Sequence, residues 1–308
     1  MENSGVKPLD ILSKEQYNEI KKTEDWRNIF SIASNWLQIV AAMVLFYMLP
    51  NAVTFFIALV IIGSKQFALA VLVHEGAHNL LFSNRILNDW STQWLCAYPI
   101  FQDNRAYRPY HLKHHRFTET EEDPDLVLSA PFPITKSSFL RKIVRDLLGI
   151  TGFRRYKGTL QSIFRSEKSS DKSRLKTLWF KIHGFLVTNI IIFTLISSFL
   201  HWSLFFLLWW LPALTYYSLI IRIRNIAEHS VTDGDNDLNN TRTTKASLLL
   251  KYFLVPLNVN YHLEHHLFTR CPWYNLPKAH KMLLDGGYAD KMCIENSYGS
   301  VLRKATSK

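Results

Sequence analysis

The segment 52-AVTFFIALVIIGSKQFALAVLVHEGAH-78 joins a long apolar run to a pair of histidines. Up to Val73 its one charged residue is Lys65, and the run exceeds the roughly 20 residues that an α-helix needs to cross a bilayer. His74 and His78 lie four residues apart, so they share one face if the helix continues. The segment therefore predicts a transmembrane helix that carries possible metal ligands just beyond its end.

Three further apolar runs of similar length occur in the chain. Together with residues 52–73, they lie at residues 31–49, 178–200 and 202–221. Only Pro50 and Asn51 separate the first two runs, and only His201 separates the last two. Connections this short join helices that run antiparallel. The sequence therefore predicts four transmembrane helices arranged in two hairpins.

The basic residues are distributed unevenly around these runs. Of the 36 Lys and Arg residues, 17 lie in residues 74–177, 12 in residues 222–308 and 5 in residues 1–30, and the two short connections hold none. Because Lys and Arg concentrate on the cytoplasmic side of membrane proteins, both termini and the middle region are expected in the cytoplasm. The basic residues behind the net charge of +11 are distributed as in a membrane protein, and the sequence contains no nucleic-acid recognition motif. No nucleic-acid partner is therefore expected. We expect a single all-α membrane domain, residues 1–308, with a cytoplasmic helical cap formed by residues 74–177 and 222–308.

Three shorter segments have patterns of their own. Residues 136–148 predict an amphipathic helix that lies either on the inner leaflet or against the cap. Residues 90–101 are apolar but too short to span, which favours a re-entrant or interfacial segment. Residues 166–173, rich in Ser and Lys, predict a solvated loop. The long side chains of Lys65 and Lys181 are expected to extend from their spans toward water.

Eight of the twelve histidines fall into three clusters. The clusters are HEGAH at residues 74–78, HLKHH at residues 111–115 and HLEHH at residues 262–266. Because helix positions i, i+3 and i+4 share a face, each cluster can direct two or three imidazoles at one point. His229 follows the fourth apolar run, and Asn225 lies one helical turn before it. The lone histidines expected to be structural are His183, His201 and His280.

Neutral imidazole binds zinc, iron, copper and nickel, so the number of ligands must indicate the metal. The HEGAH cluster fits the HExxH pattern of zinc proteases, and Asp285 resembles their distant acidic residue. A catalytic zinc uses three protein ligands, however, which would leave most of the clustered histidines unused. The three cysteines have no paired spacing, which excludes a cysteine zinc cluster. A metal transporter would need ionisable residues along its spans, whereas the histidine clusters lie outside them. Nine nitrogen ligands suit two metal ions.

The order HxxxH, HxxHH and HxxHH, with two spans between the second and third clusters, resembles the membrane fatty acid desaturase and hydroxylase superfamily. The resemblance implies four transmembrane helices under a cytoplasmic cap with a diiron centre that reacts with O2. The iron ligands that it implies are His74, His78, His111, His114, His115, His229, His262, His265 and His266. It further implies that Asn225 contacts iron through a water molecule.

The function expected from this resemblance is O2-dependent desaturation of a fatty acyl chain, as an acyl-lipid or acyl-CoA. A hydroxylase or ketolase that acts on an alkane, carotenoid or sphingolipid is the alternative, because the histidine clusters alone do not separate these enzymes. No His-Pro-Gly-Gly stretch of a fused cytochrome b5 occurs, so a separate ferredoxin, rubredoxin or cytochrome b5 is the expected electron donor. The third cluster begins with His262 instead of the Gln typical of front-end desaturases, which argues against that subclass.

Two further groups of residues are candidates for supporting roles. Histidine ligands usually donate their second ring nitrogen to a carboxylate or carbonyl. The carboxylates near the clusters in sequence are Glu75, Asp123, Asp125, Glu228 and Glu264. Aromatic residues of the fourth run could line an acyl tunnel or could pack between helices. They are Trp209, Trp210, Tyr216 and Tyr217.

Overall fold

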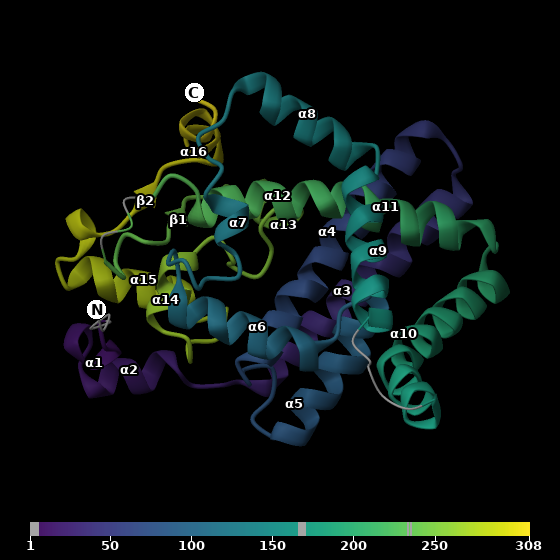
Figure 1. Ribbon diagram of the computed structural model, residues 1–308, viewed down its shortest axis with the longest axis horizontal. Coiled ribbons are helices and arrows are strands. Elements are labelled where there is room, and N and C mark those ends of the chain that lie inside the picture. The colour runs from purple at the N-terminus through teal and green to yellow at the C-terminus, as the bar shows by residue number, and fades with distance from the viewer. Residues whose placement is uncertain (1–5, 166–170, 233, 235) are drawn as a thin grey trace.

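Most residues are helical in a computed structural model that describes residues 6–165, 171–232, 234 and 236–308 (Figure 1). Four helical stretches are long and apolar enough to cross a membrane. They are built from α3 (Asp25–Met48), α4 (Ala52–Ala77), α10 (Asp171–Phe199) and the succession η3 (Phe205–Trp210), α11 (Leu211–Leu214) and α12 (Tyr216–His229). The predicted all-α architecture with four spans is confirmed.

The first hairpin has a well-defined turn and a continuous core. Asn51 caps α4, because its side-chain oxygen accepts hydrogen bonds from the backbone N–H groups of Val53 and Thr54. Along the shared length of α3 and α4, buried side chains such as Ile39 and Ile62 form one apolar core with η3. This packing fixes the position of α4, whose far end carries the first histidine cluster.

The fourth span is a succession of short helices, which its sequence explains. Pro212 has no N–H to donate to the preceding turn, which disfavours one regular α-helix through this span, and it lies at the start of α11. The π-helical segment η3 lies before this proline, and Thr215 separates α11 from α12 with a non-helical conformation (φ −103°, ψ −88°). The final piece, α12, then runs past the predicted span end at residue 221 to His229.

The helices extend beyond the apolar runs, because polar residues can continue a helix after it leaves the membrane. The helix α3 begins at Asp25 instead of residue 31, and α4 includes His74. Residues 171–173 belong to α10, so the predicted loop is wrong there, and residues 166–170 lie outside the described residues. Lys65 does not extend to water as predicted, since it is only 4% exposed.

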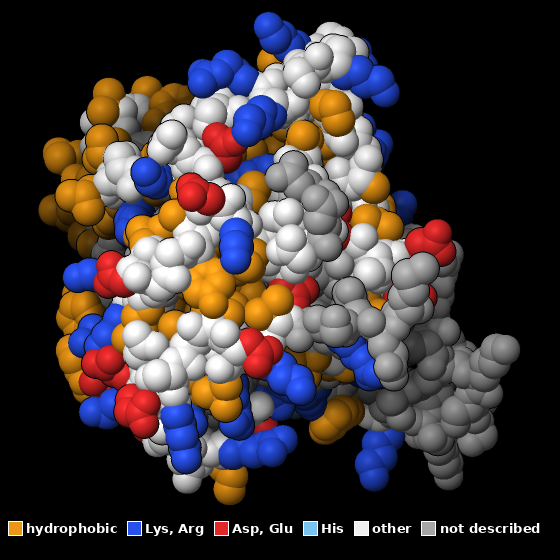
Figure 2. All heavy atoms as spheres, turned by 90° about the vertical axis from the view of Figure 1, so that its left-hand side faces the viewer, with side chains coloured by type: hydrophobic (Ala, Val, Ile, Leu, Met, Phe, Trp, Pro, Cys, Tyr) orange, Lys and Arg blue, Asp and Glu red, His pale blue; other side chains and the backbone are white. Residues whose placement is uncertain are grey.

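The remaining helices form the cap, most of which lies at the left and centre of Figure 1, while α9 (Ile150–Arg165) lies farther right, beside α10 and α11. The cap elements before the third span are α5 (Arg85–Ser91), η1 (Thr92–Ala97), η2 (Tyr98–Ile100), α6 (Asn104–Phe117), α7 (Leu126–Ser129), α8 (Lys136–Leu147) and α9 (Ile150–Arg165). The cap elements before the first span are α1 (Pro8–Ile11) and α2 (Lys14–Ile20). Those after the fourth span are α13 (Leu248–Phe253), α14 (His262–Leu267), α15 (Leu276–Asp285), η4 (Ala289–Lys291) and α16 (Tyr298–Ala305). Two short strands, β1 (Thr243–Thr244) and β2 (Ile294–Glu295), pair in parallel and were not predicted. Figure 2 shows Lys, Arg, Asp and Glu side chains interspersed over this face, as expected for a surface in water.

Two of the short predicted segments form helices. The predicted amphipathic helix is α8, which is fixed to α12 by an ion pair between buried Asp146 and Arg222. Its side chains Leu140 and Leu147 remain exposed, and this arrangement fits a helix that faces lipid on one side. Residues 90–101 form the end of α5, η1 and η2, and their buried side chains pack against α4.

Candidate metal centre

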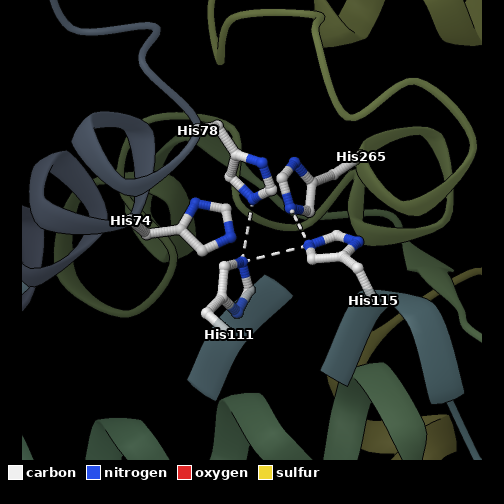
Figure 3. Close-up of side chains that lie close together, drawn as sticks. All are labelled: His74, His78, His111, His115 and His265. Atoms are coloured by element: carbon white, nitrogen blue, oxygen red, sulfur yellow. Dashed lines mark hydrogen bonds between the residues drawn. The ribbon is translucent and has the colours of Figure 1, made fainter. Parts of the chain in front are cut away.

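All nine predicted histidine ligands come together in two adjacent groups. The first group has five members, shown in Figure 3, which are His74, His78, His111, His115 and His265. The second group has four members, which are His114, His229, His262 and His266. Within each group, one ligand-type atom of every residue lies within 4.8 Å of the others. The rings of His115 and His266 stack across the two groups with their centroids 4.2 Å apart.

Helix geometry explains how the histidines divide between the groups. His111 and His115 on α6 are separated by four residues, so they point in nearly the same direction. His114 lies about 60° around the helix from His111, on the opposite flank from His115, and it reaches the second group. On α14, His262 and His266 are four residues apart and belong to the second group. His265, on the opposite flank from His266, belongs to the first group. Each of these two clusters therefore directs two imidazoles at one group, as predicted, and its third imidazole at the other group.

The nitrogen atoms of the first group fit a shared cation. The Nε2 atom of His111 lies 2.9 Å from Nε2 of His78 and 3.0 Å from Nε2 of His115. A neutral imidazole Nε2 carries either one proton or one lone pair, so these contacts cannot all be good hydrogen bonds. Both ring nitrogens of buried His74 lack a hydrogen-bond partner among the described residues. A metal ion at the centre would use these lone pairs.

The second group fits a cation for the same reason. His262 Nε2 lies 2.8 Å from Nε2 of His229 and 3.1 Å from Nε2 of His266. Burial lowers the pKa of the His262 and His111 imidazoles well below the ordinary value, and that of His78 to about 4. The rings are therefore neutral at pH 7, which is the form that binds metal ions.

Carboxylates and a hydroxyl orient several of these rings. Asp123 Oδ1 accepts a hydrogen bond from His114 Nδ1 at 2.8 Å, so Nε2 of His114 faces the second group. Although burial raises the pKa of Asp123, its bonds to His114 and to two backbone N–H groups lower it overall. Thr118 Oγ1 lies 3.2 Å from Nδ1 of His266, a contact that sequence analysis missed.

The other predicted carboxylates differ in their distance from the rings. Glu75 lies 3.6 Å from Nδ1 of His74, Glu228 3.5 Å from Nε2 of His262, and Asp125 3.8 Å from Nδ1 of His114. Glu119, which was not predicted, lies 3.6 Å from Nδ1 of His229. In the sequence, the one signal for a role of Glu119 beside a histidine is its position four residues before Asp123, in the loop after α6.

Within the part of the chain that the structure describes, the Glu264 carboxylate forms no hydrogen bond or ion pair with the nine histidines. Its carboxylate accepts hydrogen bonds from His280 Nδ1, at 2.6 Å, and from the Thr243 hydroxyl. Glu264 therefore connects α14 to α15 and to β1, and its predicted role beside a ligand is not seen. His280 is a structural histidine, as predicted, but its partner belongs to the helix that holds three ligand candidates.

Comparison with known proteins identifies the family. Residues 48–292 match the fatty acid desaturase family, which covers most of the chain. The chain belongs to the fatty acid desaturase family. It is therefore a membrane oxidoreductase of the desaturase type, and its two histidine groups are consistent with the diiron centre of that family.

Two curated relatives support the assignment. The chain is 30% identical over 260 residues to the dihydrorhizobitoxine desaturase of Bradyrhizobium elkanii, in an alignment that covers 80% of this chain and 72% of the relative. It is 24% identical over 270 residues to the Delta(5) fatty acid desaturase of Caenorhabditis elegans, with 75% of this chain and 56% of that relative covered. Both relatives are named as desaturases.

A small cavity of about 30 Å³ adjoins the second histidine group of this desaturase-family chain. Its walls include His114, His229 and His262 together with Asn225. A cavity needs about 10–15 Å³ to hold one water molecule, and this one has several polar groups around it. The position of Asn225 thus fits the predicted contact through water.

A second cavity, of about 910 Å³, approaches the centre at Tyr107, a residue that it shares with the small cavity, and none of the nine histidines lines it. Tyr107 forms part of its wall and stacks on His111 with the ring centroids 5.1 Å apart. Phe101, Phe185 and Tyr217 add apolar surface, so the cavity can accept a long apolar chain next to the first group. Of the four aromatic residues proposed for a tunnel, Tyr217 lines this cavity.

The other three aromatic residues have different positions. Trp209 is buried and stacks on Trp36 with a centroid separation of 5.6 Å, which is a packing role. Tyr216 donates a hydrogen bond to the backbone oxygen of Phe253. Trp210 lines a separate apolar groove of about 640 Å³ beside α9.

Gly76 lies between the two histidines of α4 because the neighbouring segment η1 approaches closely. A Cβ atom at this position would lie 1.9 Å from Oγ1 of Thr92. We therefore expect Gly76→Ala to lower the free energy of unfolding by about 1–3 kcal/mol, the usual cost of overpacking. Denaturant unfolding of the purified protein measures this change.

Gly158 on α9 provides the matched control. A Cβ atom there would meet no other atom within 4 Å. Gly158→Ala should leave stability unchanged or raise it slightly, because alanine favours helix. Equal stability of the Gly76→Ala and Gly158→Ala variants would show that η1 does not contact α4 closely.

Proposed function

We propose that this protein introduces a double bond into the acyl chain of a lipid, as an acyl-lipid or acyl-CoA, with O2 and two iron ions bound by the nine histidines. The observation that carries the proposal is the division of these buried histidines into groups of five and four. The cavity of about 910 Å³, which approaches the five-membered group through Tyr107 stacked on His111, supports an acyl substrate.

The two irons would supply the O2 chemistry that an unactivated C–H bond requires, since acids, bases and nucleophiles do not attack such a bond. The protein's own residues hold the ions and fix the substrate. Asp123 and Thr118 orient His114 and His266 through their Nδ1 atoms. The aromatic wall formed by Tyr107 and Phe101 would keep the acyl chain beside the first group and exclude water.

Desaturation also requires electrons, because reducing O2 to water takes more electrons than the substrate supplies. We propose a separate donor of the ferredoxin, rubredoxin or cytochrome b5 type. We also propose that the histidine groups, the cap and both termini lie on the cytoplasmic side. The 17 Lys and Arg residues between positions 74 and 177 support this orientation.

Tags inserted into the chain test this orientation. A tag at residue 51 or next to His201 should be accessible from outside intact cells, because both connections lie at the ends of α4 and α10 away from the cap. Tags at the two termini should become accessible only after the membrane is permeabilised. Labelling of a terminal tag on intact cells would contradict the orientation.

Expression in a lipid-producing host, followed by mass spectrometry of total lipids, tests the reaction. Acyl chains with an added double bond are expected, and the purified protein should contain close to two irons per chain. An added oxygen atom instead of a double bond would indicate the hydroxylase alternative. One zinc and no iron would refute the diiron proposal. A conversion of dihydrorhizobitoxine without any change in lipids would refute the acyl substrate.

Asn225→Ala tests the proposed contact through water. The side chain lines the small cavity of the four-membered group but does not belong to that group. We expect the variant to keep most of its iron and to lose about 10- to 100-fold in activity, as is usual for residues behind the direct ligands. Iron analysis and product formation on the same sample provide the two measurements. Loss of iron equal to that of a histidine variant would make Asn225 a direct ligand.

A further inference from the structure

Arg242, in the segment between α12 and β1, is buried without a carboxylate partner. Its side chain is 1% exposed, and among the described residues no Asp or Glu lies within ion-pair distance of its guanidinium. A buried charge is costly unless a charge of opposite sign or hydrogen bonds compensate it. The groups that the guanidinium bonds therefore indicate why an arginine is present at this position.

The guanidinium of Arg242 donates its hydrogen bonds to backbone oxygens at the end of α12. Nη1 donates to the carbonyl oxygens of Ala227 and Ser230, at 3.2 and 3.0 Å, and Nη2 donates to that of Val231 at 2.6 Å. The backbone N–H of Arg242 donates to the carbonyl oxygen of Glu228 at 2.9 Å. The last carbonyl groups of a helix have no partner within that helix. Arg242 supplies these partners from a distant part of the chain.

The four bonded oxygens flank His229, the last residue of α12 and a member of the second histidine group. Two of them come before His229 in the sequence and two come after it. Just past the helix end, Val231 has a left-handed backbone conformation (φ 55°), which is rare and strained for a β-branched residue. Strained backbone persists only where its surroundings hold it, and Arg242 Nη2 bonds to the oxygen of this residue. Arg242 thus holds the backbone from which the His229 ring projects.

The residues after Arg242 bond to α14 and to the turn before it. The Thr243 hydroxyl donates a hydrogen bond to the Glu264 carboxylate on α14. The backbone N–H of Thr244 donates to the carbonyl oxygen of Asn260 at 3.1 Å. The helix α14 carries two further histidines of the second group. This segment therefore connects the two elements that supply three of the four histidines in that group.

We propose that Arg242 is a positioning residue for the metal ion of the second histidine group. It holds the end of α12 in the conformation that brings Nε2 of His229 to 2.8 Å from Nε2 of His262. A guanidinium suits this role because its planar, rigid set of donors can bond several oxygens in fixed directions. The inference rests on the metal centre of the proposed function and is independent of the substrate.

Competition with an iron chelator and Mössbauer spectroscopy of the iron-loaded protein test the proposal. Arg242→Met removes all three side-chain hydrogen bonds. We expect this variant to lose iron at a chelator concentration about 10- to 100-fold lower than the wild type, the usual effect of losing a group that orients a ligand. In the loaded variant, the Mössbauer doublet of one iron should shift or broaden, because only the ion of the second group changes its ligand geometry. The other doublet should stay as in the wild type.

The matched control is Arg222→Met. Arg222 also anchors α12, through its ion pair with buried Asp146 of α8, but it lies about two helical turns before His229. Its replacement should lower stability in denaturant unfolding and leave iron retention and both doublets unchanged. Equal loss of iron from Arg222→Met and Arg242→Met would mean that Arg242 only stabilises the fold, and would overturn the proposal.

Arg242→Lys covers the case in which Arg242→Met does not fold. It keeps the charge and part of the hydrogen bonding, so an intermediate loss of iron and a smaller change in the same doublet are expected. Unchanged iron retention and unchanged doublets in the folded variant would overturn the role of Arg242. A wild-type protein that holds fewer than two irons would instead refute the diiron centre itself, which distinguishes the two failures.

Discussion

Replacing His229 with alanine should lower both the iron content and the rate of desaturation, the latter by more than about 100-fold. Loss of a residue that only orients a ligand typically costs 10- to 100-fold, so loss of a ligand should cost more. His229 is one of only four histidines in its group, and its Nε2 lies 2.8 Å from that of His262. Metal analysis and product formation on purified protein measure the two effects.

The control for this variant is His201→Ala. His201 is exposed in the connection between α10 and η3, where its ring bonds only to Ser203 among the described residues. Iron and activity should remain at the wild-type level. His280 is a poor control although it is also a lone histidine, because its ring bonds to Glu264 on α14. A His229→Ala variant with full iron and full turnover would remove His229 from the ligand set.

Ala106→Trp should abolish most of the turnover of long acyl chains while leaving the iron in place. Ala106 lines the 910 Å³ cavity on α6, five residues before His111, and is not a ligand candidate. An indole ring there would occupy space that the proposed acyl substrate needs in this cavity. Displacing a substrate by even about 1 Å can cost a factor of about 100 in rate, so an effect of at least this size is expected.

Product analysis with acyl chains of several lengths measures this effect. Ala106→Ser, which adds little volume at the same position, is the matched control and should react normally. Unchanged turnover of long chains by Ala106→Trp would mean that the substrate enters elsewhere, for example along the groove beside Trp210. A loss of iron in Ala106→Trp would instead indicate that α6 itself had moved.

The spans and the ligand candidates could be predicted because each depends on local sequence. A run of apolar residues fixes a membrane helix without reference to the rest of the chain. Clusters such as His111 to His115 are likewise visible in a few consecutive letters. The structure brings all nine histidines together, and it separates Glu264 from them because that carboxylate faces α15.

Features that depend on distant contacts could not be predicted. Helix geometry separates His114 and His265 from their neighbours, but which group each one joins depends on how α6 and α14 face each other, and the sequence pattern does not specify that. Thr118 contacts His266, which lies 148 positions away in the sequence. Glu119 contacts His229, which lies 110 positions away. The burial of Lys65 depends on Tyr252, a residue of the cap that folds against α4.

The shared use of α6 and α14 has a consequence for how metal ions would be taken up. Each of these helices supplies ligands to both groups, so an ion in one group holds the same two helices that the other group requires. Occupation of the first position would reduce the conformational freedom that the second ion must remove, and the two binding free energies would be coupled. Loading would then be cooperative, with few molecules that contain a single ion. By the same coupling, any event that releases α14 would empty both positions together.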